Sequence, residues 1–459
     1  MISENIKYYK IFIVIIFLLV NYIAHIYSVD NATYIYGADA GRYYIPALDF
    51  VSGKGLGDIS STGPLYPLYI ASHIWIFGEH YAQDALVITQ SFLLLVTGYI
   101  VMLLAKDTKL PTPLLIVFMF VVLNPNSIMV THFIQTETVF TFLLIMYFYF
   151  IKEYVNLQNT RTLLYLSIVA VLVSYARPAG MYVMLFFFLI TMLIGFKGNL
   201  KVKLISHCIV YYVILLTGLG LLASYNHKIH GEYFVSANKG FVFYDQYIGL
   251  LQYGRNLSAF DAHKIAKNTL KNEVDQSQSI CIDNLKLIQC RDKVASIYIK
   301  KIINEDPAVI FKAFSSSVAS LMLSGGASNF SNYYGLDTKK QINNFEHSKG
   351  GMFQITKIIK LIENTNMSYF IALIVFWGWA VITKILMVIG IYHGISQDNK
   401  LYFYSIFVLI LLFILEYMFL GQSRWRVPLD PIFMMFSAVG ATYLIRKFKK
   451  QHFRHIVSK

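Results

Sequence analysis

Long apolar runs recur along the chain, and most have the length of a helix that crosses a lipid bilayer. Such a helix needs on the order of 17 to 25 mostly apolar residues. The pattern therefore predicts an all-α polytopic membrane protein with about ten spans. The runs are Lys10–Val29, Ala85–Leu104, Leu114–Thr131, Val139–Val155, Leu163–Ala176, Ala179–Phe196, Leu204–Tyr225, Ser368–Ile395, Leu401–Leu420 and Pro428–Ile445.

Composition agrees with a membrane protein, since 56% of the 459 residues are hydrophobic and only 14% are charged. The formal net charge of +14 raises the alternative of nucleic-acid binding. However, the lysines and arginines lie in short clusters beside the apolar runs, as membrane topology requires. We interpret the first run as an anchor rather than a cleaved signal peptide, because it is long and no A-x-A-like site follows it.

Lysine and arginine clusters fall on one side of the membrane if the spans alternate, and this side is predicted to be cytoplasmic. Both termini are then cytoplasmic. The loop from Asp30 to about Gln83 and the segment from Asn226 to Met367 lie outside. We accordingly divide the chain into an N-terminal membrane module (1–225), an outer segment with amphipathic helices (226–367) and a C-terminal membrane module (368–459).

Two of the three cysteines, Cys281 and Cys290, lie in the long outer segment. An oxidising compartment permits a disulfide between them, and we favour this bond over two free thiols. The stretch after Pro307 combines a helix-starting proline with an apolar face, so it is predicted to lie at the outer membrane surface.

Two acidic residues are predicted at the outer membrane face. Asp39 follows the first span in "YGADAGRYYIPALDF", and Glu137 begins the fourth span in "THFIQTETVF", close to His132. Either carboxylate could simply cap a helix. A carboxylate at a membrane boundary is also a candidate functional group, because it is costly unless solvated or paired.

Three arginines are predicted at the same face. Arg177 precedes a proline in "SYARPAGMY", whereas Arg424 and Arg426 occupy the outer loop "GQSRWRVPLDPIF". Arg177 could be a snorkelling side chain. The other two run against the positive-inside trend and so need a different explanation. Arginine suits phosphate and a carboxylate can accept a hydroxyl proton, so these residues fit group transfer from a lipid phosphate to an alcohol.

A chain of short motifs resembles the GT-C class of polytopic glycosyltransferases, in particular the bacterial relatives of dolichyl-phosphate-mannose protein mannosyltransferases and the lipid A aminoarabinose transferase. The motifs are "GADAGRYYIPALDFVSGKG", "GPLYPLYIA", "QTETVFTFLL", "YARPAGMYVML", "SYNHKIHGEYFVSANKGFVFYDQY" and "SRWRVPLDPIFMMFSA", in the order of that class. Each is weak alone, and the series of six is more specific. Asn226, His227 and Lys228 depart from the arginine–asparagine pair that is usual in the fifth motif.

The resemblance implies inverting transfer of a sugar from a polyprenyl-phosphate donor, undecaprenyl phosphate in bacteria, on the outer side of the inner membrane. The acceptor would be an envelope glycan, a lipid such as lipopolysaccharide, or a protein. It further implies that Asp39 is the general base and that Glu137 is a second acid. Arg424 and Arg426, with Arg177, would bind the donor phosphate.

Further substrate contacts are expected from Arg42, Tyr43, Tyr44, Tyr66 and His132. The three tyrosines could be sugar platforms, but we favour an interfacial aromatic belt because the chain has 34 tyrosines. No metal-ligand motif appears, so no cofactor is assigned, and a divalent ion between Asp39 and Glu137 is left open. The alternative functions are an O-antigen or capsule polymerase and, third, a lipid-linked glycan transporter. A transporter would place its charged groups nearer the bilayer midplane.

Overall fold

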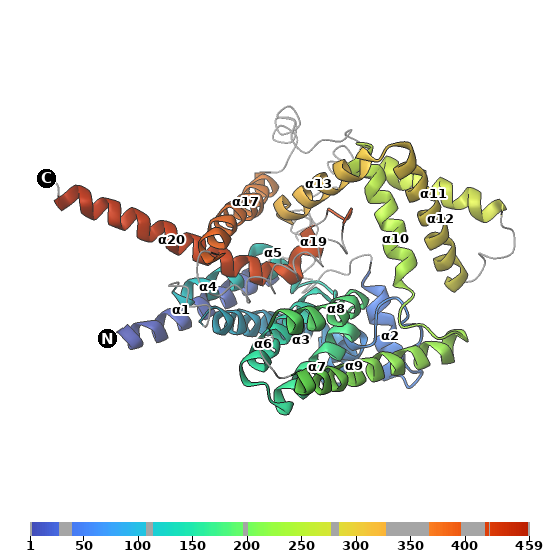
Figure 1. Ribbon diagram of the computed structural model, residues 1–459, viewed down its shortest axis with the longest axis horizontal. Helices are drawn as coiled ribbons and strands as arrows, with labels where there is room; N and C mark the ends of the chain where they lie inside the picture. The colour runs from blue at the N-terminus through green and yellow to red at the C-terminus, as the bar shows by residue number, and fades with distance from the viewer. Residues whose placement is uncertain are drawn as a thin grey trace.

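The computed structural model of the protein describes residues 2–26, 39–106, 113–195, 201–276, 284–326, 367–395, 418–421 and 423–457. All regular secondary structure in these ranges is helical. The elements form a helical bundle, and a smaller group of helices stands beside it (Figure 1).

The bundle has two parts that share one large hydrophobic core. One part contains α2 (Gly41–Val51), α3 (Leu65–Lys106), α6 (Glu137–Leu157), α7 (Thr160–Ala176), α8 (Pro178–Gly195) and α9 (Lys201–His230). The other contains α1 (Ile2–Ile26), α4 (Leu114–Val122), α5 (Pro125–Val130), α17 (Met367–Ile395) and α20 (Asp430–Val457). The core is built mainly from α3, α6, α7 and α20, so the last helix of the chain packs among the earlier ones.

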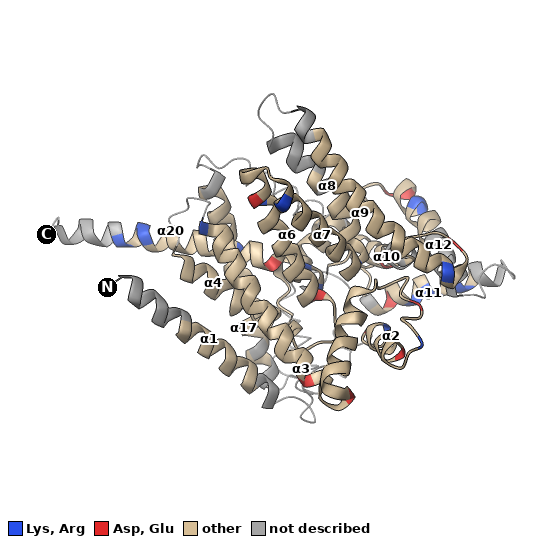
Figure 2. Ribbon diagram, turned by 90° about the horizontal axis from the view of Figure 1, so that it is seen from below, with Lys and Arg blue, Asp and Glu red and all other residues tan. Residues whose placement is uncertain are grey.

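The outer segment forms the smaller group, which has a core of its own. It consists of α10 (Asn238–Gly249), the π-helix η2 (Leu250–Gly254), α11 (Ala259–Gln276), α12 (Asn284–Glu305) and α13 (Ala308–Leu323). The helix predicted after Pro307 is therefore present as α13. In Figures 1 and 2, α11 and α12 lie at the end of the molecule opposite both termini.

Among the described residues, five helices are long and apolar enough to cross a membrane: Leu65–Lys106, Glu137–Leu157, Ile205–His230, Leu373–His393 and Arg424–Lys449. The larger count of about ten stays a prediction, because one expected span, Leu401–Leu420, falls almost entirely outside the described residues. Lys and Arg gather on α20 where it extends beyond the bundle (Figure 2).

Local sequence signals explain where the helices break. The expected span Leu114–Thr131 is divided into α4 and α5, because the side chain of Asn124 caps the backbone N–H of Asn126 and Pro125 occupies the first helical position. Inside α3, Gly78 has φ 74° and ψ 158°, a conformation that favours glycine, and the helix kinks there. Glycine also allows α17 and α20 to cross closely, since a side chain at Gly390 or Gly440 would meet the other helix's backbone.

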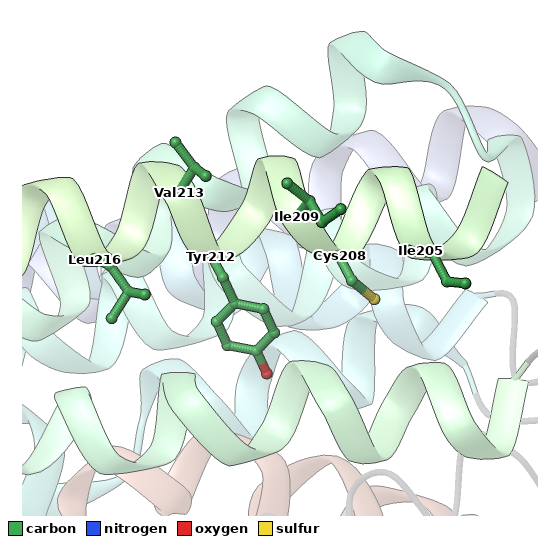
Figure 3. A pocket seen from close by; sticks show the side chains of 6 residues that line it. All are labelled: Ile205, Cys208, Ile209, Tyr212, Val213 and Leu216. Atoms are coloured by element: carbon green, nitrogen blue, oxygen red, sulfur yellow. The ribbon is translucent and has the colours of Figure 1, made fainter. Parts of the chain in front are cut away.

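An open apolar pocket runs along α9 and is lined by Ile205, Cys208, Ile209, Tyr212, Val213 and Leu216 (Figure 3). Tyr212 extends from this surface and donates a hydrogen bond to the carbonyl oxygen of Leu185 in α8. None of the lining side chains is charged, and the pocket surface is almost entirely apolar.

Candidate active site

Asp39 lies in the turn that directly precedes α2. Its backbone carbonyl accepts a hydrogen bond from the N–H of Arg42, which starts the helix. The N-cap position belongs to Ala40, and no side chain caps α2, so the capping interpretation of Asp39 is wrong. The Asp39 side chain remains 30% exposed and can be reached from outside.

Glu137 is the first residue of α6, and its side chain is completely buried. The cap position is occupied by Thr136 instead. A carboxylate in the first turn is favoured by the positive end of the helix dipole. Within the described residues, its Oε2 atom has no hydrogen-bond partner.

Arg177 lies between α7 and α8 with an extended backbone (φ −156°, ψ 130°). The proline at position 178 imposes this conformation, because a residue before proline is disfavoured in helical geometry. The side chain is turned inward: its Nη1 atom lies 3.6 Å from Glu137 Oε1, and its guanidinium lies 4.5 Å from the ring centre of Trp425. It is therefore a buried member of the site rather than a snorkelling side chain.

Arg424 joins the two acids. It belongs to the four-residue helix α19 (Ser423–Arg426), and its Nε atom donates to Glu137 Oε1 at 2.5 Å. Its Nη1 atom donates to Asp39 Oδ2 at 2.6 Å. Residues from four distant parts of the sequence thus form one cluster, the carboxylate–arginine cluster: Asp39, Glu137, Arg177 and Arg424.

Electrostatics in this cluster favour the ionised form of Asp39. Burial alone raises the pKa of Asp39, but the charge and hydrogen bond of Arg424, with Arg42 and Arg177, outweigh burial and hold the pKa below 3.8. Arg42 contributes through a looser contact, with Nη1 3.7 Å from Asp39 Oδ1. Burial and the nearby Glu137 carboxylate raise the pKa of Tyr43, so its phenol stays neutral.

Arg426 is not part of the cluster. Its Nε atom donates to Asp430 at 2.8 Å, and its Nη1 atom donates to carbonyl oxygens at the C-terminal end of α13. The side chain is 3% exposed. The structure therefore separates the two arginines that the sequence analysis had assigned together to the donor phosphate.

The predicted tyrosines are buried in the core, so their interpretation as an interfacial belt is wrong. Tyr43 contacts Tyr66 edge to face with ring centres 5.2 Å apart, and Tyr66 donates to Gln90. Tyr44 is 7% exposed. His132 is enclosed in the turn after α5, where its Nδ1 atom lies 3.1 Å from the carbonyl oxygen of Ile128.

Two other predictions are untested. Cys281 lies outside the described residues, so its pairing with Cys290 stays a prediction. Within the described ranges, no group of three or more His, Cys, Asp or Glu residues is arranged to hold a metal ion.

Lys384, Arg426 and Asp430 form a second buried group of charges, which was not predicted from the sequence. Asp430 is completely buried and Lys384 is 7% exposed. A charge inside an apolar run is itself a signal of function. Lys384, in the run Ser368–Ile395, could have been found on that basis.

The helical fold agrees with the fold that the motif resemblance predicted, because solved structures of a polytopic oligosaccharyltransferase share it. No protein-family model matches the chain, and no curated protein sequence matches it. Solved structures of the oligosaccharyltransferase of Archaeoglobus fulgidus share the fold.

One of these, the enzyme AglB in complex with an inhibitory peptide and a dolichol-phosphate, has 13% sequence identity and a TM-score of 0.53, covering 98% of this chain and 52% of that chain. The complex with Zn and sulfate has 14% identity and a TM-score of 0.52, covering 96% and 50%. The apo form has 14% identity and a TM-score of 0.53, covering 98% and 52%. The chain thus spans about half the length of these neighbours.

Proposed function

We propose that the protein is a membrane glycosyltransferase that moves a sugar from a polyprenyl-phosphate donor to an acceptor hydroxyl. The observation that carries this proposal is the guanidinium of Arg424, which bonds to both Asp39 and Glu137 at the mouth of a GT-C bundle. In bacteria the reaction would take place on the outer face of the inner membrane, with an envelope glycan, lipid or protein as acceptor.

The donor phosphate is assigned to Arg424, assisted by Arg177. A guanidinium carries five N–H groups, and within the described residues Nη2 of Arg424 makes no hydrogen bond. Its 20% exposure leaves a path for a phosphate at the headgroup level. Arg177 adds a second positive charge that stabilises the negative charge growing on the departing phosphate. Arg426 is left out of this role, because its donors already contact Asp430 and α13.

Asp39 is assigned as the general base. While Arg424 holds it, its lowered pKa makes it a poor proton acceptor. A donor phosphate that competes for Arg424 weakens this hold and raises the proton affinity of Asp39. The base thus becomes effective when the donor is bound.

Glu137 is assigned to the sugar. The bond between sugar and phosphate breaks through a transition state with positive charge on the sugar ring, which a nearby carboxylate stabilises. Glu137 is buried and ionised beside two arginines, and its Oε2 atom has no partner among the described residues. Attack by the acceptor on the face opposite the phosphate then gives inversion.

One structural neighbour supports the donor class, since its structure is a complex with an inhibitory peptide and a dolichol-phosphate. A polyprenyl phosphate has the same combination of a charged head and a hydrocarbon tail. Such a donor suits a cluster of arginines at the end of apolar helices.

Mass spectrometry of envelope glycans and glycolipids tests the proposal. A deletion strain of the native host is complemented with wild type, Asp39→Asn or the control Asp49→Asn. Asp49 is an acid of α2 that pairs with Lys54, 3.7 Å away, rather than with the cluster. We expect one sugar mass to disappear from a defined acceptor in the deletion and in Asp39→Asn, with normal protein levels, and to return with Asp49→Asn.

The other outcomes distinguish the alternatives. Collapse of long glycans to single repeat units would identify a polymerase. Unchanged glycans would contradict glycosyl transfer and favour transport. Full activity of Asp39→Asn would remove Asp39 from the reaction.

A further inference from the structure

Arg424 and Arg426 lie two residues apart on one short helical turn but have different partners. Positions i and i+2 of an α-helix point about 200° apart around its axis. Arg424 therefore contacts Asp39 and Glu137 on one side, and Arg426 contacts α13 and Asp430 on the other. Any rotation or shift of this turn moves both guanidiniums together.

Arg426 closes the C-terminal end of α13. Its Nη1 atom lies 2.8 Å from the carbonyl oxygens of Leu321 and Met322 and 2.9 Å from that of Ser324. The last carbonyls of a helix have no partner within the helix, and a positive charge is favoured there. The contact thus ties the outer segment to the turn that carries Arg424.

Asp430 holds Arg426 in place and connects two further elements, α17 and α5. One oxygen accepts from Arg426 Nε at 2.8 Å and lies 3.5 Å from Lys384 Nζ in α17. The other accepts from Asn124 Nδ2 at 3.3 Å, and Asn124 caps α5. Because the carboxylate is completely buried, these contacts are shielded from solvent and constrain the start of α20.

The segment before the turn is also anchored. The N–H of Phe419 donates to Gln246 Oε1 at 2.7 Å, and the hydroxyl of Ser320 donates to the carbonyl oxygen of Gly421 at 2.6 Å. Arg424 therefore lies between an attachment to the outer segment and the buried Asp430 network. The turn that carries both arginines joins this network to the carboxylate–arginine cluster.

We infer that Asp430 is a positioning residue which, through Arg426, fixes the guanidinium of Arg424 between Asp39 and Glu137. This inference rests on the proposed function, because it assigns Asp430 to the reaction without placing it in contact with substrate. A residue that only balanced buried charge would have no influence on Asp39.

A charge-matched set of variants separates positioning from charge balance. The wild-type network carries two cations and one anion, so its net charge is +1. Asp430→Asn raises the net charge of the network to +2. The double variant Asp430→Asn/Lys384→Met restores a net charge of +1, but Arg426 still lacks its carboxylate acceptor. The double variant should therefore recover protein level and unfolding midpoint toward the wild-type values.

The diagnostic measurement is the pH dependence of kcat/KM, with polyprenyl-phosphate-linked sugars extracted from native host membranes as the donor. If Asp39 loses Arg424, its pKa rises, and the acid limb of the profile moves to higher pH. We expect this shift in both variants, with turnover about a hundredfold lower, as misplacement by about 1 Å can cause. Asp49→Asn should keep the wild-type profile.

A wild-type acid limb in the folded double variant would overturn the inference, as would recovery of full turnover. Hydrogen–deuterium exchange supplies a readout that needs no activity: residues 423–430 and 319–324 should exchange faster in both variants. If neither variant accumulates, Arg426→Lys tests the same link, since lysine keeps the charge but loses the planar fork. Wild-type exchange in Arg426→Lys would also contradict positioning.

These measurements keep the two proposals apart. Wild-type protein that transfers no sugar, but shows the expected differences in exchange, would refute the function and leave the mechanical link. Sugar transfer with unaltered exchange and an unaltered acid limb would refute the link alone.

Discussion

Replacement of Arg424 by methionine removes the charge that the two acids share, and the cost can be worked out from the geometry. Glu137 is completely buried and would keep only Arg177, whose Nη1 atom is 3.6 Å from Oε1. Breaking a buried ion pair by removing one partner costs about 3–5 kcal/mol. We expect Arg424→Met to lower the free energy of unfolding by that amount.

A double-mutant cycle isolates the Arg424–Glu137 interaction itself. For charges about 4 Å apart at an effective dielectric constant of about 20, the interaction is worth about 4 kcal/mol. The cycle with Asp39 should give only about 1 kcal/mol, because that carboxylate is 30% exposed and water screens the pair. The two coupling energies should therefore differ clearly.

The assay is equilibrium unfolding of the purified variants in mixed detergent micelles, with Glu137→Gln and Asp39→Asn as the second substitutions. Arg42→Met is the matched control: it removes an arginine 3.7 Å from Asp39 but 42% exposed, and should cost about 0.5 kcal/mol or less. A Glu137 coupling below about 1 kcal/mol, or equal couplings for both acids, would refute the reasoning.

Asp39 must be ionised to act as a base, and its lowered pKa moves the acid limb of wild-type kcat/KM to a lower pH than an unperturbed aspartate would give. In Arg424→Gln, burial becomes the dominant influence on the pKa of Asp39 and raises it. The acid limb of the residual activity should therefore move to higher pH. An unmoved acid limb would contradict the assignment of Asp39 as the base. The same ionised carboxylate stabilises the fold above its unfolded-state pKa, and this contribution should disappear as the pH falls through the folded-state value. Gly249→Ala would force a Cβ against the carbonyl oxygen of Phe419 and should cost about 1–3 kcal/mol in unfolding measurements. The control Gly220→Ala has nothing within 4 Å of the added atom and should be neutral or slightly stabilising, and equal effects at both glycines would contradict the close approach.

The members of the carboxylate–arginine cluster could be selected from the sequence because alternation of spans reports which ends share a face. Asp39, Glu137, Arg177 and Arg424 each lie at such an end, and the structure brings their side chains together. The alternation of spans carries no information about the direction in which each side chain points around a helical turn. It therefore grouped Arg426 with Arg424, although their side chains point to opposite sides of the same helical turn.

The wrong prediction of a tyrosine belt and the unpredicted contact between Lys384 and Asp430 have a common physical cause. Burial depends on partners far away in sequence. The many tyrosines of the chain suggested an interfacial belt, but Tyr66 is enclosed by Tyr43 of α2 and by Gln90, which lies 24 positions further along α3. Lys384 and Asp430 are 46 positions apart and only the fold makes them neighbours. By contrast, the break inside the expected span Leu114–Thr131 has a local signal in the sequence, a capping residue (Asn124) followed by proline (Pro125).

The order in which the chain is synthesised gives the Arg424 bridge a further meaning. The ribosome releases Asp39 and Glu137 long before the turn that neutralises them, which comes 385 and 287 positions later. Until that last outer turn is in place, Glu137 is an acid within an apolar bundle and lacks its closest cation. Completion of the carboxylate–arginine cluster and relief of this instability are one event, so an unfinished chain carries a buried carboxylate without its main partner and is destabilised by it.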